Sequence, residues 1–151
     1  MSSELAGRTA VVTGSSSGIG KAIALELAAA GANILVHARG NQIGADQTAA
    51  LVSELGRDVE VVVLDLRSID NQVSLVQQAW QWRPVDIWIN NAGADVLTGE
   101  AADWPFLKKL ETLWQVDVTA TIHISRLVGQ RMLERTDQHH DPSIVNMGWD
   151  Q

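Results

Sequence analysis

The stretch Thr-Gly-Ser-Ser-Ser-Gly-Ile-Gly, residues 13–20, decides the fold of this chain. An apolar run at residues 9–12 precedes it, and an alanine-rich helical pattern at residues 19–30 follows it. A strand that ends at a glycine loop and continues as a helix directs free backbone N–H groups and the positive helix end at one point. The stretch therefore predicts a phosphate-binding site at the start of the helix.

The glycine spacing separates the known kinds of phosphate loop. Five residues lie between Gly14 and Gly20 and Lys21 is followed by Ala22, whereas a P-loop has four intervening residues and a Ser or Thr after its lysine. Ile23 stands where a G-x-G-x-x-G fingerprint that began at Gly18 would have its last glycine. The spacing therefore argues against both loops. The alternative to a phosphate-binding loop is a strand-to-helix turn that is rich in glycine and serine for steric reasons alone.

The composition is that of one globular domain, with 151 residues, 46% of them hydrophobic and 19% charged. A net charge of −7 and a pI near 4.9 argue against a nucleic-acid partner, because binding to a phosphate backbone needs clustered Lys and Arg. Cysteine is absent, so disulfides and thiolate metal sites are impossible. Neither a signal region nor an apolar stretch of membrane-spanning length is present, so we expect no membrane partner and a cytoplasmic location.

Strand and helix patterns alternate along the chain at short intervals. Apolar runs with little polar alternation predict strands that are buried on both faces, at residues 9–13, 33–37, 59–65, 86–90 and 143–147. Helical patterns lie between them, at residues 19–30, 45–55, 69–82 and 107–135. Ser68 is the predicted N-cap of the third helix, which ends before Pro84. The alternation predicts a doubly wound α/β fold with five parallel strands.

In such a sheet a dinucleotide lies across the carboxyl ends of the strands, where the strand order reverses. The second predicted strand leads into Ala38 and Arg39. A carboxylate here would bind the ribose 2′-hydroxyl of NAD, whereas an arginine would pair with the 2′-phosphate of NADP. The sequence therefore favours NADP over NAD. The alternative for Arg39 is a solvated loop charge.

A second motif, Asn-Asn-Ala-Gly at residues 90–93, ends the fourth predicted strand. Together with residues 13–20 it resembles the T-G-x-x-x-G-x-G and N-N-A-G motifs of the short-chain dehydrogenase/reductase family, over essentially the whole chain. Asp65 matches the acidic residue of that family near the adenine ring, while Ser17 replaces a basic residue that would strengthen the NADP preference. The resemblance implies a Rossmann-type sheet and these cofactor-binding residues: Gly14, Ser16, Ser17, Gly18, Ile19, Gly20, Arg39, Asp65, Leu66, Asn91, Ala92 and Gly93.

The resemblance also implies reversible hydride transfer between nicotinamide and a carbonyl or alcohol carbon. The family performs it with a tyrosine, a lysine four residues later, a serine on the fifth strand and an asparagine on the preceding long helix. This chain has no tyrosine. Trp149 aligns with the serine and Asp117 with the asparagine, and a carboxylate lacks the donor of an amide unless it is protonated. No catalytic residue is therefore secure.

Two interpretations of the whole chain remain open. In the first, residues 1–151 are a single truncated domain, the amino-terminal and cofactor-binding part of a dehydrogenase that acts on a small-molecule carbonyl or alcohol and forms a homo-oligomer. In the second, the chain is a standalone NADP-binding module or a partner subunit. His139, His140 and Asp141 are adjacent on a polar loop, so we expect no metal site there. The sequence does not identify the substrate.

Overall fold

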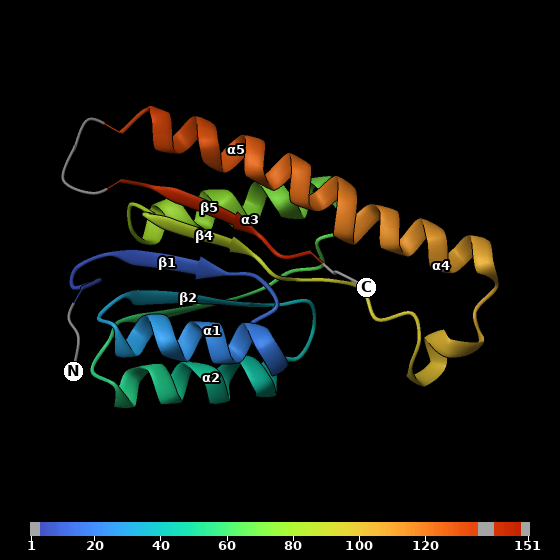
Figure 1. Cartoon of the computed structure of the whole chain (residues 1–151), viewed down its shortest axis with the longest axis horizontal. Helices are drawn as coiled ribbons and strands as arrows, with labels where there is room; N and C mark the ends of the chain where they lie inside the picture. The colour runs from blue at the N-terminus through green and yellow to red at the C-terminus, as the bar shows by residue number, and fades with distance from the viewer. Residues whose placement is uncertain (1–3, 136–140, 149–151) are drawn as a thin grey trace.

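The computed structural model describes residues 4–135 and 141–148 and contains a five-stranded sheet flanked by helices (Figure 1). The predicted α/β fold is confirmed. The strands are β1 (Thr9–Val12), β2 (Asn33–Ala38), β3 (Val59–Val63), β4 (Ile87–Asn90) and β5 (Ser143–Asn146). The helices are α1 (Gly18–Ala29), α2 (Gln42–Glu54), α3 (Ile69–Trp82), α4 (Phe106–Leu113) and α5 (Thr121–Leu133), with a 3-10 turn η1 (Gly99–Asp103) and a π-helical segment η2 (Trp114–Ala120).

All strands of the sheet are parallel, in the order β3-β2-β1-β4-β5. The chain moves outward from β1 to β3 and then returns to the other side of β1, so the order reverses between β1 and β4. Helices α1 and α2 cover one face and α3 and α5 the other (Figure 1). A ligand cleft is therefore expected at the carboxyl ends of β1 and β4.

The local sequence explains how α1 and α3 are placed. Gly20, Ala24 and Ala28 recur on the buried side of α1, and these small residues let the helix approach the sheet closely. The Ser68 hydroxyl caps α3 by accepting a hydrogen bond from the Asn71 N–H at 3.3 Å, which confirms the predicted N-cap.

The prediction of one continuous helix over residues 107–135 is wrong about its continuity. The structure divides it into α4, the π-helical segment η2 and α5. The π-helical segment is only seven residues long and lies between two α-helices, so the sequence pattern predicts one helix across all three. The segment contains Asp117, and π-helical insertions are frequent at functional sites.

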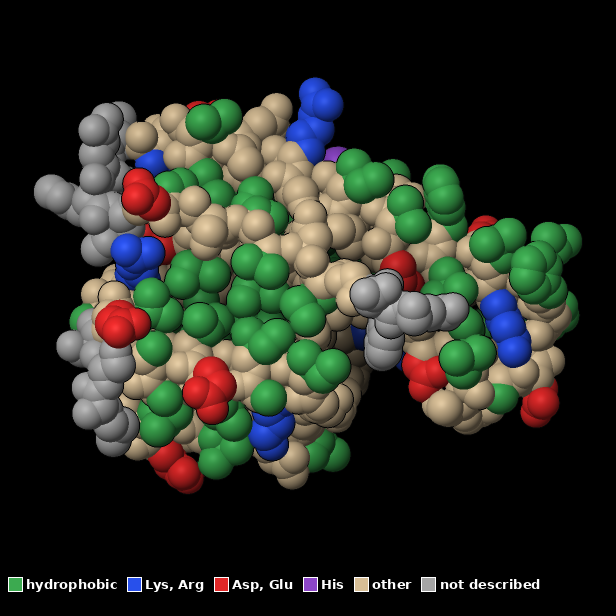
Figure 2. Space-filling view, in the orientation of Figure 1, with side chains coloured by type: hydrophobic (Ala, Val, Ile, Leu, Met, Phe, Trp, Pro, Cys, Tyr) green, Lys and Arg blue, Asp and Glu red, His purple; other side chains and the backbone are tan. Residues whose placement is uncertain are grey.

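The expectation of burial on both faces is also wrong for β5. This strand lies at the edge of the described sheet, and Val145 is 43% exposed. Figure 2 shows hydrophobic side chains across the region between α5 and α1. It shows them again on the arm, which we define as residues 99–114 and which carries η1 and α4. Four large apolar side chains of that arm are exposed: Phe106, Leu107, Leu110 and Trp114. Within the described residues, no helix has both the length and the hydropathy that a bilayer-spanning segment requires.

Candidate functional site

The glycine loop after β1 packs directly against the residues that follow β4. Gly14 has a φ of +67°, and a Cβ atom on it would lie 2.9 Å from the Ala92 Cα. A Cβ atom on Gly20 would collide with the Gly14 carbonyl oxygen and the Asn91 side-chain amide. Only glycine fits these two positions without displacement of the neighbouring backbone.

Hydrogen bonds join the two motifs on which the family resemblance rests. The Thr13 hydroxyl accepts bonds from the backbone N–H groups of Asn91 at 3.0 Å and Ala92 at 2.9 Å. The Asn91 side-chain amide donates to the carbonyl oxygens of Thr13 at 3.0 Å and Gly14 at 3.3 Å. The ends of β1 and β4 therefore form one rigid unit at the point where the strand order reverses.

The amino-terminal end of α1 points out of this unit with its backbone donors available. Ser17 occupies the N-cap position and makes no side-chain capping bond, and Gly18 and Ile19 beside it are exposed. The first N–H groups of a helix have no partner within the helix, and the helix dipole adds positive potential there. An exposed, uncapped helix start fits a phosphate group.

The adenosine side of the predicted site is built from the ends of β2 and β3. Ala38 is buried and Arg39 is exposed, so of these two side chains only that of Arg39 is accessible at this edge. Arg67 donates to the Asp65 carboxylate in a bidentate arrangement, with Nη2 to Oδ2 at 2.6 Å and Nε to Oδ1 at 3.1 Å. Hydrogen bonds from Arg67 lower the pKa of Asp65, and the charge of Arg39 acts in the same direction. Leu66 is buried.

A cavity of about 100 Å³ opens beside the two interlocked motifs. It brings together predicted cofactor residues from α1 and the end of β4 with Asp117 from η2. Its lining residues are Ile19, Asn91, Ala92, Gly93, Asp117, Thr121, Met147 and Gly148. Segments far apart in sequence, from α1, the end of β4, η2, the start of α5 and the end of β5, thus converge on one hollow at the carboxyl edge of the sheet.

Asp117 is the acidic group of this cavity. Its Oδ2 accepts a hydrogen bond from the Ala94 N–H at 3.3 Å, and its Oδ1 lies against Gly93, where a Cβ atom would come within 2.9 Å. Burial raises the pKa of Asp117, which favours the protonated form that can donate a hydrogen bond. Trp149, the other substituted position, lies outside the described residues, as do His139 and His140.

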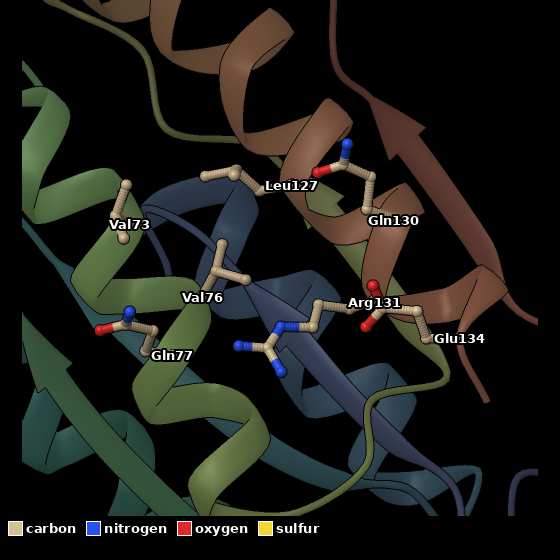
Figure 3. A pocket seen from close by; sticks show the side chains of 7 residues that line it. All are labelled: Val73, Val76, Gln77, Leu127, Gln130, Arg131 and Glu134. Atoms are coloured by element: carbon tan, nitrogen blue, oxygen red, sulfur yellow. The ribbon is translucent and has the colours of Figure 1, made fainter.

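A larger cavity, of about 290 Å³, lies elsewhere, between α3 and α5 (Figure 3). Arg135, close after α5, donates to the Val85 carbonyl oxygen before β4, so this part of α5 lies toward the amino-terminal edge of the sheet. The cavity is lined by Val73, Val76, Gln77, Leu127, Gln130, Arg131 and Glu134. It therefore lies away from the carboxyl ends of the strands, where a dinucleotide is expected in this type of sheet.

Thr13 and His37 organise the loop, although neither is among the residues predicted for the site. Thr13 links the two motifs, and the buried His37 accepts a hydrogen bond from the Gly14 N–H at 3.1 Å. An ionisable residue within the otherwise apolar run of β2 was the available signal for His37. Thr13 has no such signal, because its contacts with Asn91 and Ala92 depend on the sheet.

Two curated relatives of this chain are dehydrogenases. The 3beta-hydroxysteroid dehydrogenase 1 of Eggerthella lenta is 35% identical over 124 residues, which are 80% of this chain and 45% of that protein. The L-rhamnose 1-dehydrogenase (NADP(+)) of Thermoplasma acidophilum is 31% identical over 129 residues, which are 85% of this chain and 50% of that protein. The chain thus spans about half the length of these curated relatives.

A solved structure gives the same correspondence. The 3-oxoacyl (acyl-carrier-protein) reductase of Agrobacterium tumefaciens, with NADP bound, matches with a TM-score of 0.76 and 30% identity over 87% of this chain and 50% of that one. The family model for the short chain dehydrogenase matches residues 8–148. The chain therefore belongs to the short-chain dehydrogenase/reductase family and has its NAD(P)-dependent oxidoreductase fold.

Proposed function

We propose that this chain binds NADP(H) and is the cofactor-binding part of a cytoplasmic oxidoreductase, which transfers hydride between nicotinamide and a small-molecule carbonyl or alcohol. The observation that carries the proposal is the interlocked unit of Gly14, Gly20 and Asn91 beneath the uncapped start of α1. A side chain at either glycine would fill the space between the motifs, and the helix start offers backbone donors to a phosphate.

In this proposal each part of the chain has a defined task when the cofactor binds. The first N–H groups of α1 hold the pyrophosphate, and Arg39 pairs with the 2′-phosphate. Asp65, fixed by Arg67, accepts a hydrogen bond from the adenine amine. The bound cofactor supplies or accepts the hydride.

The substrate side is proposed to need residues that this chain does not carry. Burial raises the pKa of Asp117 beside the cavity, but the chain has no tyrosine to serve as the acid. A hydroxyl proton must move during carbonyl reduction, and a positioned acid contributes about 10²–10⁴-fold to such a step. We therefore expect the chain alone to bind the cofactor without reducing a carbonyl compound.

A second role, as an NADP-binding subunit that associates with another chain, is supported by the exposed arm. Phe106, Leu107 and Trp114 are 74%, 74% and 61% exposed. Apolar side chains gathered in this way mark association surfaces in proteins. In either role the assembly is proposed to be an oligomer.

The cofactor proposal is tested by titrating NADPH and NADH into the chain and following tryptophan fluorescence and the melting temperature. We expect saturable binding with NADPH tighter than NADH, and Arg39→Asp should remove or reverse the preference. A folded sample that responds to neither cofactor would overturn the proposal. Steady consumption of NADPH with a carbonyl substrate would contradict the expected inactivity of the chain alone.

A further inference from the structure

His37 is an ionisable residue placed inside the apolar strand β2. Its neighbours Val36 and Ala38 are buried, and His37 itself is 1% exposed. An imidazole at such a depth must have partners for both ring nitrogens, because an unpaired buried polar group is unfavourable. The structure provides these partners, and both lie at the carboxyl ends of strands.

The two ring contacts determine the tautomer of His37. The Gly14 N–H donates to Nδ1 at 3.1 Å, so Nδ1 carries no proton. Nε2 lies 2.9 Å from the Leu64 carbonyl oxygen, which can only accept, so Nε2 carries the proton. The neutral ring thereby links the first glycine of the loop to the residue that precedes Asp65.

Backbone bonds strengthen the same link. The Ser15 N–H donates to the His37 carbonyl oxygen at 2.9 Å, and the His37 N–H donates to the Ser15 hydroxyl oxygen at 3.1 Å. That hydroxyl in turn donates to the Val12 carbonyl oxygen at 2.7 Å. The first two residues after Thr13 are thus held on His37 by both their backbone and a side chain.

We propose that His37 is a positioning residue for the cofactor: its ring fixes Gly14, and through it the phosphate loop, relative to the Leu64–Leu66 segment at the adenine edge. The proposal rests on the proposed function, since it concerns the same NADP(H) site. His37 has no contact with the cofactor in this role and acts through Gly14. Its ring must remain neutral for the loop to keep this position, because a second ring proton would face the Gly14 N–H.

Two substitutions separate the two ring contacts. The Oδ1 atom of an asparagine occupies about the position of Nδ1 and accepts from Gly14, but the side chain is too short for Leu64. The Nε2 atom of a glutamine reaches about the position of the histidine Nε2 and donates to Leu64, but no acceptor is left beside Gly14. His37→Asn therefore keeps the loop contact and His37→Gln loses it, while each variant removes one buried hydrogen bond.

The experiment measures the NADPH dissociation constant and the melting temperature of the wild-type chain and both variants. We expect both variants to melt earlier, His37→Gln to bind NADPH about tenfold more weakly and His37→Asn to stay within about threefold of wild type. Asp86→Asn is the matched control. Asp86 is also buried and accepts from the Thr9 N–H at 2.8 Å, but it lies at the opposite edge of the sheet. We expect it to lower the melting temperature without a change in the dissociation constant.

Two results would overturn the role of His37 but leave the proposed function intact. One is equal weakening of NADPH binding in His37→Asn and His37→Gln, and the other is wild-type affinity in His37→Gln. Failure of the wild-type chain to bind NADPH would overturn the proposed function and this inference together. If a variant does not fold, the scalar coupling across the hydrogen bond between the Gly14 amide nitrogen and His37 Nδ1 provides the test in wild type. We expect this coupling with and without saturating NADPH, and its loss on saturation would contradict the proposal.

Discussion

The two sides of the sheet differ in how completely the described chain covers and connects them. Around β1 and β2, all ten strand residues except Asn33 are buried, and the loop that follows β1 is bonded to the ends of β2 and β4. Around β5 and α4, three of the four residues of β5 are exposed and the arm presents Phe106, Leu107 and Trp114 to solvent.

This difference agrees with the proposed positions of the cofactor and the substrate. A dinucleotide site needs backbone groups at fixed positions, and parallel strands buried on both faces provide them. The β5 side holds the half-buried Asp117 next to exposed apolar surface. The ends of β1 and β2 are therefore firmly held, whereas the β5 side of the described chain combines one half-buried acid with exposed apolar surface.

The largest expected effect is a difference in stability between the two sides. Leu35→Ala removes a side chain that is 0% exposed, and we expect it to lower the free energy of unfolding by about 2–5 kcal/mol. Val145→Ala, at a residue that is 43% exposed, should change it by less than about 0.5 kcal/mol. Urea unfolding of both variants measures the two values, and similar costs would refute the contrast.

Acid should destabilise the cofactor side through His37. Burial lowers the pKa of His37 from 6.5 to about 4, despite the opposing influence of Asp65. Between these values the unfolded chain binds a proton and the folded chain does not. Stability is therefore intact above pH 6.5 and falls toward pH 4, by at most about 1.4 kcal/mol per pH unit.

The histidine contribution is isolated by comparing the pH dependence of unfolding in wild type and His37→Asn. Carboxylates titrate in both proteins, so the difference between the two curves belongs to His37. We expect the destabilisation of the variant to shrink as the pH falls from 6.5 to about 4. A constant difference across that range would show that His37 is protonated at its ordinary pKa.

Gly20→Val should abolish most of the cofactor affinity. The new side chain collides with the Gly14 carbonyl oxygen and the Asn91 amide, so the two motifs separate. We expect NADPH binding to weaken at least about 100-fold, which corresponds to about 2.7 kcal/mol. Gly129→Ala is the control, because its added Cβ would meet only the Ile144 Cδ1 at 3.9 Å. Retained affinity in Gly20→Val would show that the loop does not bind the cofactor.

The smallest expected effect concerns Asp117. Its raised pKa means that the carboxyl group gains a negative charge as the pH rises through the acid range, and this charge opposes the phosphates of NADPH. We expect wild-type affinity to weaken by about threefold or less on this rise, and Asp117→Asn to remove that component. Calorimetric titrations at several pH values measure it. An identical pH dependence in both proteins would exclude Asp117 from the site.

Local sequence predicted the parts of the molecule whose structure is determined locally. The spacing of residues 13–20, the N-N-A-G motif and the apolar runs were sufficient for the parallel sheet, and α3 was predicted with its observed bounds. The cofactor assignments remain predictions. They gain support because the structure brings Gly14, Gly20 and Asn91 into contact.

The remaining features depend on contacts between distant segments. The π-helical segment around Asp117 is seven residues long and lies between two α-helices, so the sequence predicted one continuous helix. The exposure of Val145 follows from the position of β5 at the edge of the described sheet, and strand order cannot be read from apolar content. The role of His37 required knowing that Gly14 and Leu64 both lie beside it.

The most direct test of the cofactor site is an amide chemical-shift map of the ¹⁵N-labelled chain during titration with NADPH. We expect the largest shifts in the glycine loop, at Arg39, in the Asp65 and Leu66 segment and at residues 91–93. The cavity between α3 and α5, lined by Val73 and Arg131 among others, should remain unchanged. Shifts confined to that cavity, or an unperturbed glycine loop at saturation, would contradict the account.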